Sequence, residues 1–178
     1  MGIPTLISTS TASDSSSVDI TSGIDGTYDE YMFVMTDIHA EEIGERIQFQ
    51  VSTDGGSSYG VTITSTYFDA YHKEDDSAAA ISYQPARDLA QSTSKQDLNR
   101  GMGINNDDSH AGILHLFAPS NTTYVKHFYS TCSHVEHGNT SMNGYVAGYV
   151  NSTSAVDAIQ FSMGSGNFSG VIQLYGIA

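Results

Sequence analysis

Apolar and polar residues alternate along most of this chain, with the period of two that is typical of β-strands. In residues 46–52, for example, Ile47, Phe49 and Val51 are apolar and glutamines stand between them. Clusters of glycine, asparagine, aspartate, serine and proline separate the alternating segments. The pattern predicts nine or ten strands, over residues 18–24, 28–38, 46–52, 61–72, 79–83, 112–118, 123–135, 141–150, 155–163 and 171–177.

One of these segments carries apolar side chains on both faces. In residues 28–38, Tyr31 and Phe33 belong to one face, whereas Met32 and Val34 belong to the other. We therefore expect this strand to be buried on both sides.

The strands together predict an all-β fold, a single-domain β-sandwich of jelly-roll-like type formed by residues 18–178. A chain of 178 residues is the right length for one domain. About eight strands in two sheets close around one core in a jelly roll. No segment repeats at a fixed interval, which argues against propellers and solenoids.

We expect residues 1–17 to form an ordered N-terminal arm ahead of the sandwich. They contain a short apolar group followed by a serine- and threonine-rich run. An ordered terminus must be held, either by the sheet or by a neighbouring subunit. We expect interface residues in the apolar group, namely Ile3, Pro4, Leu6 and Ile7.

A long irregular segment, residues 85–108, interrupts the strand pattern. It is longer than most structureless loops in compact domains, and loops of this length are usually functional. It contains half of the six basic residues, Arg87, Lys95 and Arg100, which we add to the expected interface. The alternative is an ordinary ordered insertion.

The charge balance excludes several partners. Six basic residues stand against 20 acidic ones, so the net charge is −14. Nucleic-acid binding needs clustered lysine and arginine, and we expect no nucleic-acid or membrane partner. No apolar run approaches the length of a membrane span, and the first residues lack the features of a signal peptide.

Metal-ligating residues are concentrated in residues 132–137. On a strand, Cys132, His134 and Glu136 share one face and His137 lies on the other. Zinc sites usually combine two short ligand pairs, and no second pair matches this one. His134 and His137 are therefore weak candidates, either within one chain or as rings from three subunits around a symmetry axis.

No motif for catalysis stands out. Cys132 is the only cysteine of the chain and lacks the signature of a catalytic cysteine, and the acidic pairs are sequence neighbours that point to opposite faces of a strand. We expect no enzymatic activity and no cofactor. A hydrolase or lyase would need paired carboxylates in a cleft, and the sequence offers no sharp candidate for them.

Several stretches resemble, in order, a family of small virion structural proteins of tailed bacteriophages, especially marine ones. They are IPTLI at 3–7, IDGTYDEY at 24–31, STDGG at 52–56, GILHLF at 112–117, YVKHFY at 124–129, IQF at 159–161 and GVIQLYG at 170–176. The resemblance implies a β-sandwich exposed on a virion, as a fibre, spike, tail or capsid-decoration component. It implies no catalytic residues.

From the resemblance we expect a protein made in the host bacterial cytoplasm and assembled into the virion. Its partners would be copies of itself, as a homotrimer, and other virion proteins. The alternative is a carbohydrate- or receptor-binding module at a fibre tip, which would recognise host surface glycans. Tyr67, Tyr71 and Tyr83 are the aromatic residues that this alternative would use.

Overall fold

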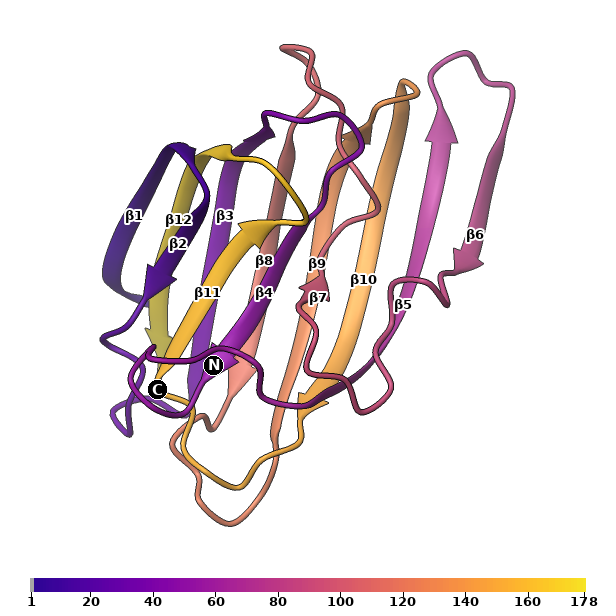
Figure 1. Ribbon diagram of the computed structural model, residues 1–178. Helices are drawn as coiled ribbons and strands as arrows, with labels where there is room; N and C mark the ends of the chain where they lie inside the picture. The colour runs from indigo at the N-terminus through magenta and orange to yellow at the C-terminus, as the bar shows by residue number, and fades with distance from the viewer. Residues whose placement is uncertain (1) are drawn as a thin grey trace.

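The computed structural model describes residues 2–178, which form two antiparallel sheets packed face to face (Figure 1). The large sheet contains eight strands in the spatial order β1 (Thr5–Ser15), β12 (Phe168–Ile177), β3 (Glu30–Ala40), β8 (His110–Phe117), β9 (Lys126–Glu136), β10 (Thr140–Val150), β5 (Ile63–Lys73) and β6 (Ala79–Tyr83). The small sheet contains four, in the order β2 (Ser17–Ile20), β11 (Ala158–Met163), β4 (Ile47–Ser52) and β7 (Gln96–Asp97).

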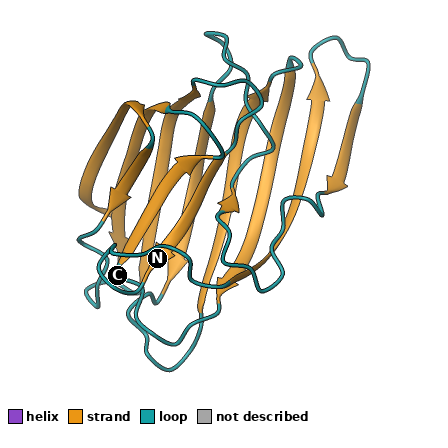
Figure 2. Cartoon of the chain, in the orientation of Figure 1, coloured by secondary structure: helices purple, strands orange, loops and turns teal. Residues whose placement is uncertain are grey.

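The predicted β-sandwich is confirmed. The chain repeatedly crosses from one sheet to the other, as it does in jelly-roll-like folds, so that neighbouring strands are seldom consecutive in sequence. Figure 2 shows strands joined by loops throughout the described part of the chain. No helix long and apolar enough to cross a membrane occurs in residues 2–178.

Aromatic side chains join the two sheets across the core. The ring centroids of Phe33 and Phe161 lie 5.6 Å apart, and those of Phe49 and Phe128 lie 5.1 Å apart and edge to face. Each pair takes one ring from each sheet, and all four rings are buried. The edge-to-face pair of Phe49 and Phe128 adds to the stability gained by burying apolar area.

Within residues 2–178, other elements cover only the inner face of the large sheet. Tyr31 and Phe33 of β3 are fully buried, whereas Met32 and Val34 on the opposite face are half-buried. The prediction that residues 28–38 are buried on both sides is therefore wrong. The physical reason is that the small sheet packs on one face, and an antiparallel sheet can leave its other face to solvent.

The residues predicted as an arm form an edge strand. Strand β1 pairs with β12 from Thr5 opposite Gly176 to Ser15 opposite Phe168. Its inner face contributes the buried Ala12 to the core. The sequence predicts a terminus held either by the sheet or by a neighbouring subunit. The contacts of β1 with β12 hold it within the sheet.

Residues 85–108 cover the inner face of the large sheet beyond the small sheet (Figure 1). Leu98 and Met102 are fully buried, and the amide of Ser65 in β5 donates to the carbonyl of Leu89. The segment is irregular except for the two residues of β7. The contacts that residues 85–108 make with the rest of the chain are those of an ordered insertion that completes the core.

Candidate functional site

Strand β6 is an uncovered edge of the large sheet. Among the described residues it pairs with β5 alone, and in Figure 1 it projects beyond the small sheet. Ile81 is 77% exposed and Tyr83 is 53% exposed. Edge strands usually avoid pairing with another chain by carrying charged residues or proline. The strand Ala79–Tyr83 contains neither. Its free backbone groups are therefore open to a further strand.

Strand β1 is the opposite edge of the same sheet. Four predicted interface residues lie in it or just before it. Ile3 is 88% exposed, Leu6 is 51% exposed and Pro4 is also exposed, whereas Ile7 packs against the core. Three of these four residues are thus open to a partner.

The three basic residues of the predicted interface contact groups of the same chain. Arg87 lies 3.1 Å from Asp97, Lys95 donates to the Ser162 hydroxyl at 2.6 Å, and Arg100 lies 3.7 Å from Glu136, as given by the side-chain nitrogen–oxygen distances. Burial lowers the pKa of Lys95. These contacts give each residue a role in fixing residues 85–108.

The outer face of the large sheet carries a band of aromatic residues. Phe68 and Tyr145 stack with ring centroids 4.8 Å apart, and the ring of Tyr129 stacks on that of His115 at 4.5 Å. Phe68, Tyr145 and Tyr129 line a hollow of about 280 Å³, which is almost wholly apolar. The carbohydrate alternative named Tyr67, Tyr71 and Tyr83. Of these, Tyr67 lies on the inner face and is fully buried.

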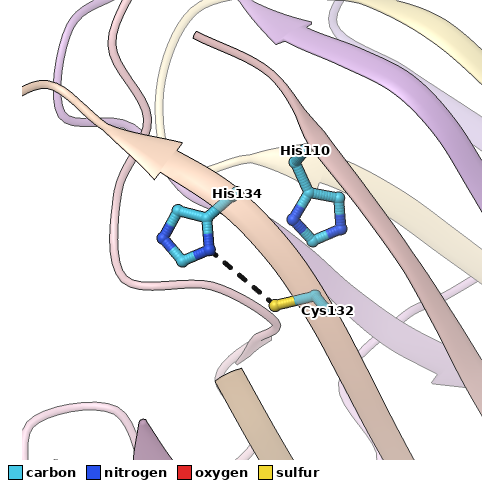
Figure 3. A group of neighbouring side chains, drawn as sticks. All are labelled: His110, Cys132 and His134. Atoms are coloured by element: carbon cyan, nitrogen blue, oxygen red, sulfur yellow. Dashed lines mark hydrogen bonds between the residues drawn. The ribbon is translucent and has the colours of Figure 1, made fainter. Parts of the chain in front are cut away.

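A buried histidine–cysteine cluster lies inside the sandwich. The pairing of β8 with β9 sets His110 opposite His134, and Cys132 lies two residues before His134 on the same inward face (Figure 3). One ligand atom from each of the three side chains lies within 4.8 Å of the others. The Sγ atom of Cys132 is 3.9 Å from Nδ1 of His134.

Burial governs the chemistry of the cluster. It lowers the pKa of His110 to about 3, helped by the proximity of His134. Burial, with Arg100 nearby, lowers the pKa of His134 to about 4. Burial also raises the pKa of Cys132 to about 12, and its thiol donates to the carbonyl of Leu98 at 3.2 Å. At neutral pH the metal-free cluster therefore holds two neutral imidazoles and a thiol.

The structure separates the two histidines that the sequence offered as metal candidates. His134 is 2% exposed, so it lies inside one chain and not at a contact between copies. His137 is exposed in the turn after β9. Sequence reasoning missed His110. The signal that could have found it is the short turn between the strands predicted at 112–118 and 123–135: in the structure the two strands pair about Thr122, from which His110 and His134 are equally distant in the sequence.

No model of a known protein family matches the chain, and no curated protein is detectably similar to it.

Proposed function

We propose that this protein is a structural component of a tailed-phage virion, a homotrimer that works through protein–protein contacts. The family resemblance of the sequence supports the virion assignment. The uncovered strand β6 supports self-association, and it is the observation that carries the proposal.

The contact joins strand β6 of one copy to strand β1 of the next. A closed ring needs two different surfaces on each subunit, because a heterologous interface closes when its rotation divides a full turn. The large sheet provides two such surfaces in its opposite edges. Both edges are almost free of charge, since Asp14 is the only charged residue of β1 and β6 has none. Backbone hydrogen bonds across the contact would continue the sheet from copy to copy.

Sedimentation of two matched variants tests the proposal. Ile81→Lys places a charge on the β6 edge, whereas Ile43→Lys makes the same change at an isoleucine that is 63% exposed in the loop between β3 and β4. We expect the wild type and Ile43→Lys to sediment as trimers, and Ile81→Lys as a monomer. A monomeric wild type contradicts the proposal, and so does a trimeric Ile81→Lys.

A second candidate function is the binding of carbohydrate on the outer face. The observation that favours it is the apolar hollow lined by Phe68, Tyr129 and Tyr145 on that face. Aromatic faces with a few polar groups are the usual lining of small-ligand sites.

Glycan binding by the wild type and by Tyr145→Ala tests this second function. Binding to host polysaccharides that Tyr145→Ala abolishes supports it, with the exposed Tyr124→Ala as the matched control. Equal binding by the two variants, or none by the wild type, contradicts it.

A further inference from the structure

We propose that His110, Cys132 and His134 form a buried binding site for one Zn²⁺ ion per chain. This inference is independent of how the copies assemble, because the three residues lie in the interior of a single chain. It depends on four features: the donor set, the unpaired donors, the glycines that make room, and the charge.

The donor set is one that zinc prefers. Two imidazole nitrogens and one sulfur come from side chains whose ligand atoms lie within 4.8 Å of one another. At the usual zinc bond lengths of about 2.0–2.3 Å, ligand atoms on one ion lie roughly 3–4 Å apart. Modest rotation of the imidazole rings closes that difference. Calcium and magnesium prefer oxygen donors, which makes them poor occupants.

The histidines lack the partners that buried polar groups normally have. Both ring nitrogens of His110 and Nε2 of His134 are buried without any hydrogen-bond partner. The hydroxyl of Tyr67 and Oδ2 of Asp69, on the inner face of β5, are also unpartnered. Among the described residues, these account for five of the eight buried side-chain atoms in that condition. Buried polar groups are almost always satisfied, so such a concentration points to a ligand position.

Two glycines leave the room that the ligands need. A methyl group at Gly112 would lie 2.9 Å from Nε2 of His110 and from Cβ of Cys132. A methyl group at Gly144 would lie 2.9 Å from the Tyr67 hydroxyl and 3.0 Å from Sγ of Cys132. The Tyr67 hydroxyl and the Cys132 sulfur therefore border the same space beside Gly144.

The charge and proton balance are also suitable. When Zn²⁺ binds, the Cys132 thiol loses its proton to solvent and the sulfur–zinc bond forms, while both histidines stay neutral. The thiolate offsets one of the two positive charges. The buried Asp69 of β5 stands opposite Gly144 of β10, which in turn stands opposite Cys132 of β9, so an acidic side chain lies on the same inner face two strands from the sulfur. Because the site is buried, the ion must enter during folding.

The test is to refold the full chain with equimolar Zn²⁺, remove loose metal, and measure zinc per chain. We expect one Zn²⁺ in the wild type and a tenfold or greater loss in Cys132→Ser and His110→Gln. His137→Gln is the matched control and should keep its zinc, because His137 is exposed outside the cluster. A wild type that contains no zinc overturns the proposal, because ordered water would then satisfy the buried polar atoms of the site. Unchanged zinc in Cys132→Ser also overturns it.

A second measurement remains decisive where a variant fails to fold. Wild-type protein refolded with Co²⁺ should show the thiolate-to-cobalt charge-transfer absorption and the intense visible bands of a tetrahedral site. Absence of the charge-transfer absorption from folded, cobalt-loaded protein overturns the assignment of Cys132. Binding of Cu⁺ with no binding of Zn²⁺ or Co²⁺ overturns the choice of ion.

Discussion

His110 and His134 face each other across strands β8 and β9, with ring centroids 6.2 Å apart and ring planes inclined at 36°. Neither ring reaches solvent, and three of their four nitrogens lack a hydrogen-bond partner. Two adjacent imidazoles in a dry interior resist protonation, because each charge would be both desolvated and close to the other.

This arrangement predicts acid sensitivity of the metal-free protein. In the unfolded chain a histidine binds a proton near pH 6.5, whereas His110 and His134 have folded pKa values of about 3 and about 4. Between these limits the unfolded state binds more protons, so stability falls as the pH falls. Each histidine should lower the free energy of unfolding by up to about 1.4 kcal/mol per pH unit, from about pH 6 to pH 4.

Denaturant unfolding at several pH values, with a chelator present, measures this slope. His110→Gln should reduce the slope of the free energy of unfolding against pH by nearly the contribution of one histidine. His137→Gln should leave this slope unchanged. Equal slopes in the wild type and His110→Gln would contradict the assignment of a low pKa to His110.

A tight approach between β10 and β5 predicts a large effect of one methyl group. At Gly148 an added methyl would collide with the carbonyl oxygen of Thr64 and would lie 2.8 Å from the ring of Phe128. Gly148→Ala should lower the free energy of unfolding by about 1–3 kcal/mol, as overpacking does. At Gly138 the nearest atom is 3.8 Å away, so Gly138→Ala should change stability by less than about 0.5 kcal/mol. Chemical denaturation compares the two variants.

The carboxylate of Asp97 holds two arginines to the small sheet. Nε of Arg46 lies 3.3 Å from it and Nη1 of Arg87 lies 3.1 Å from it, and Gln48 donates to its other oxygen. Asp97→Asn leaves two partly buried guanidinium groups without their counter-charge. We expect a loss of about 2–4 kcal/mol in unfolding experiments, somewhat less than for fully buried pairs. Asp107→Asn, at an exposed position, should have no measurable effect. A stability equal to that of the wild type would show that the arginines do not depend on Asp97.

The proposed assembly should depend on salt in an unusual direction. Copies with a net charge of −14 repel one another, while the edges that meet are almost uncharged. Salt screens the repulsion over a distance of about 8–10 Å at physiological strength, without weakening the contact itself. Sedimentation should therefore show tighter association at high salt than at low salt. Weaker association at high salt would indicate a contact built on ion pairs.

The sequence predicted the sandwich because alternation with a period of two survives wherever one sheet face is buried. All ten predicted strands are present in the structure, with ends shifted by a few residues. Strands β1 and β7 were not predicted, for different reasons. Strand β1 is made largely of serine and threonine and buries only Ala12, and β7 has two residues. Neither length nor pattern distinguishes such segments from loops.

Two of the three residues of the histidine–cysteine cluster could be brought together from the sequence. Cys132 and His134 share a strand face by simple alternation, which needs no tertiary information. His110 joins them through the register of β8 against β9, and a shift of one residue would turn its side chain to the outer face. Residues 85–108 also reach the cluster, since the Leu98 carbonyl accepts a hydrogen bond from Cys132, and no local pattern specifies the path of this segment over the sheet.

The most direct test of the proposed assembly is cross-linking between the two sheet edges. Leu6→Cys and Ile81→Cys place exposed thiols on β1 and β6, while the native Cys132 is buried. With a short bis-maleimide, the chain carrying both changes should give covalent trimers, and a mixture of the two single variants should give covalent dimers. Cross-linking of Ile81→Cys to itself alone, or no cross-linking of the double variant, would contradict the account.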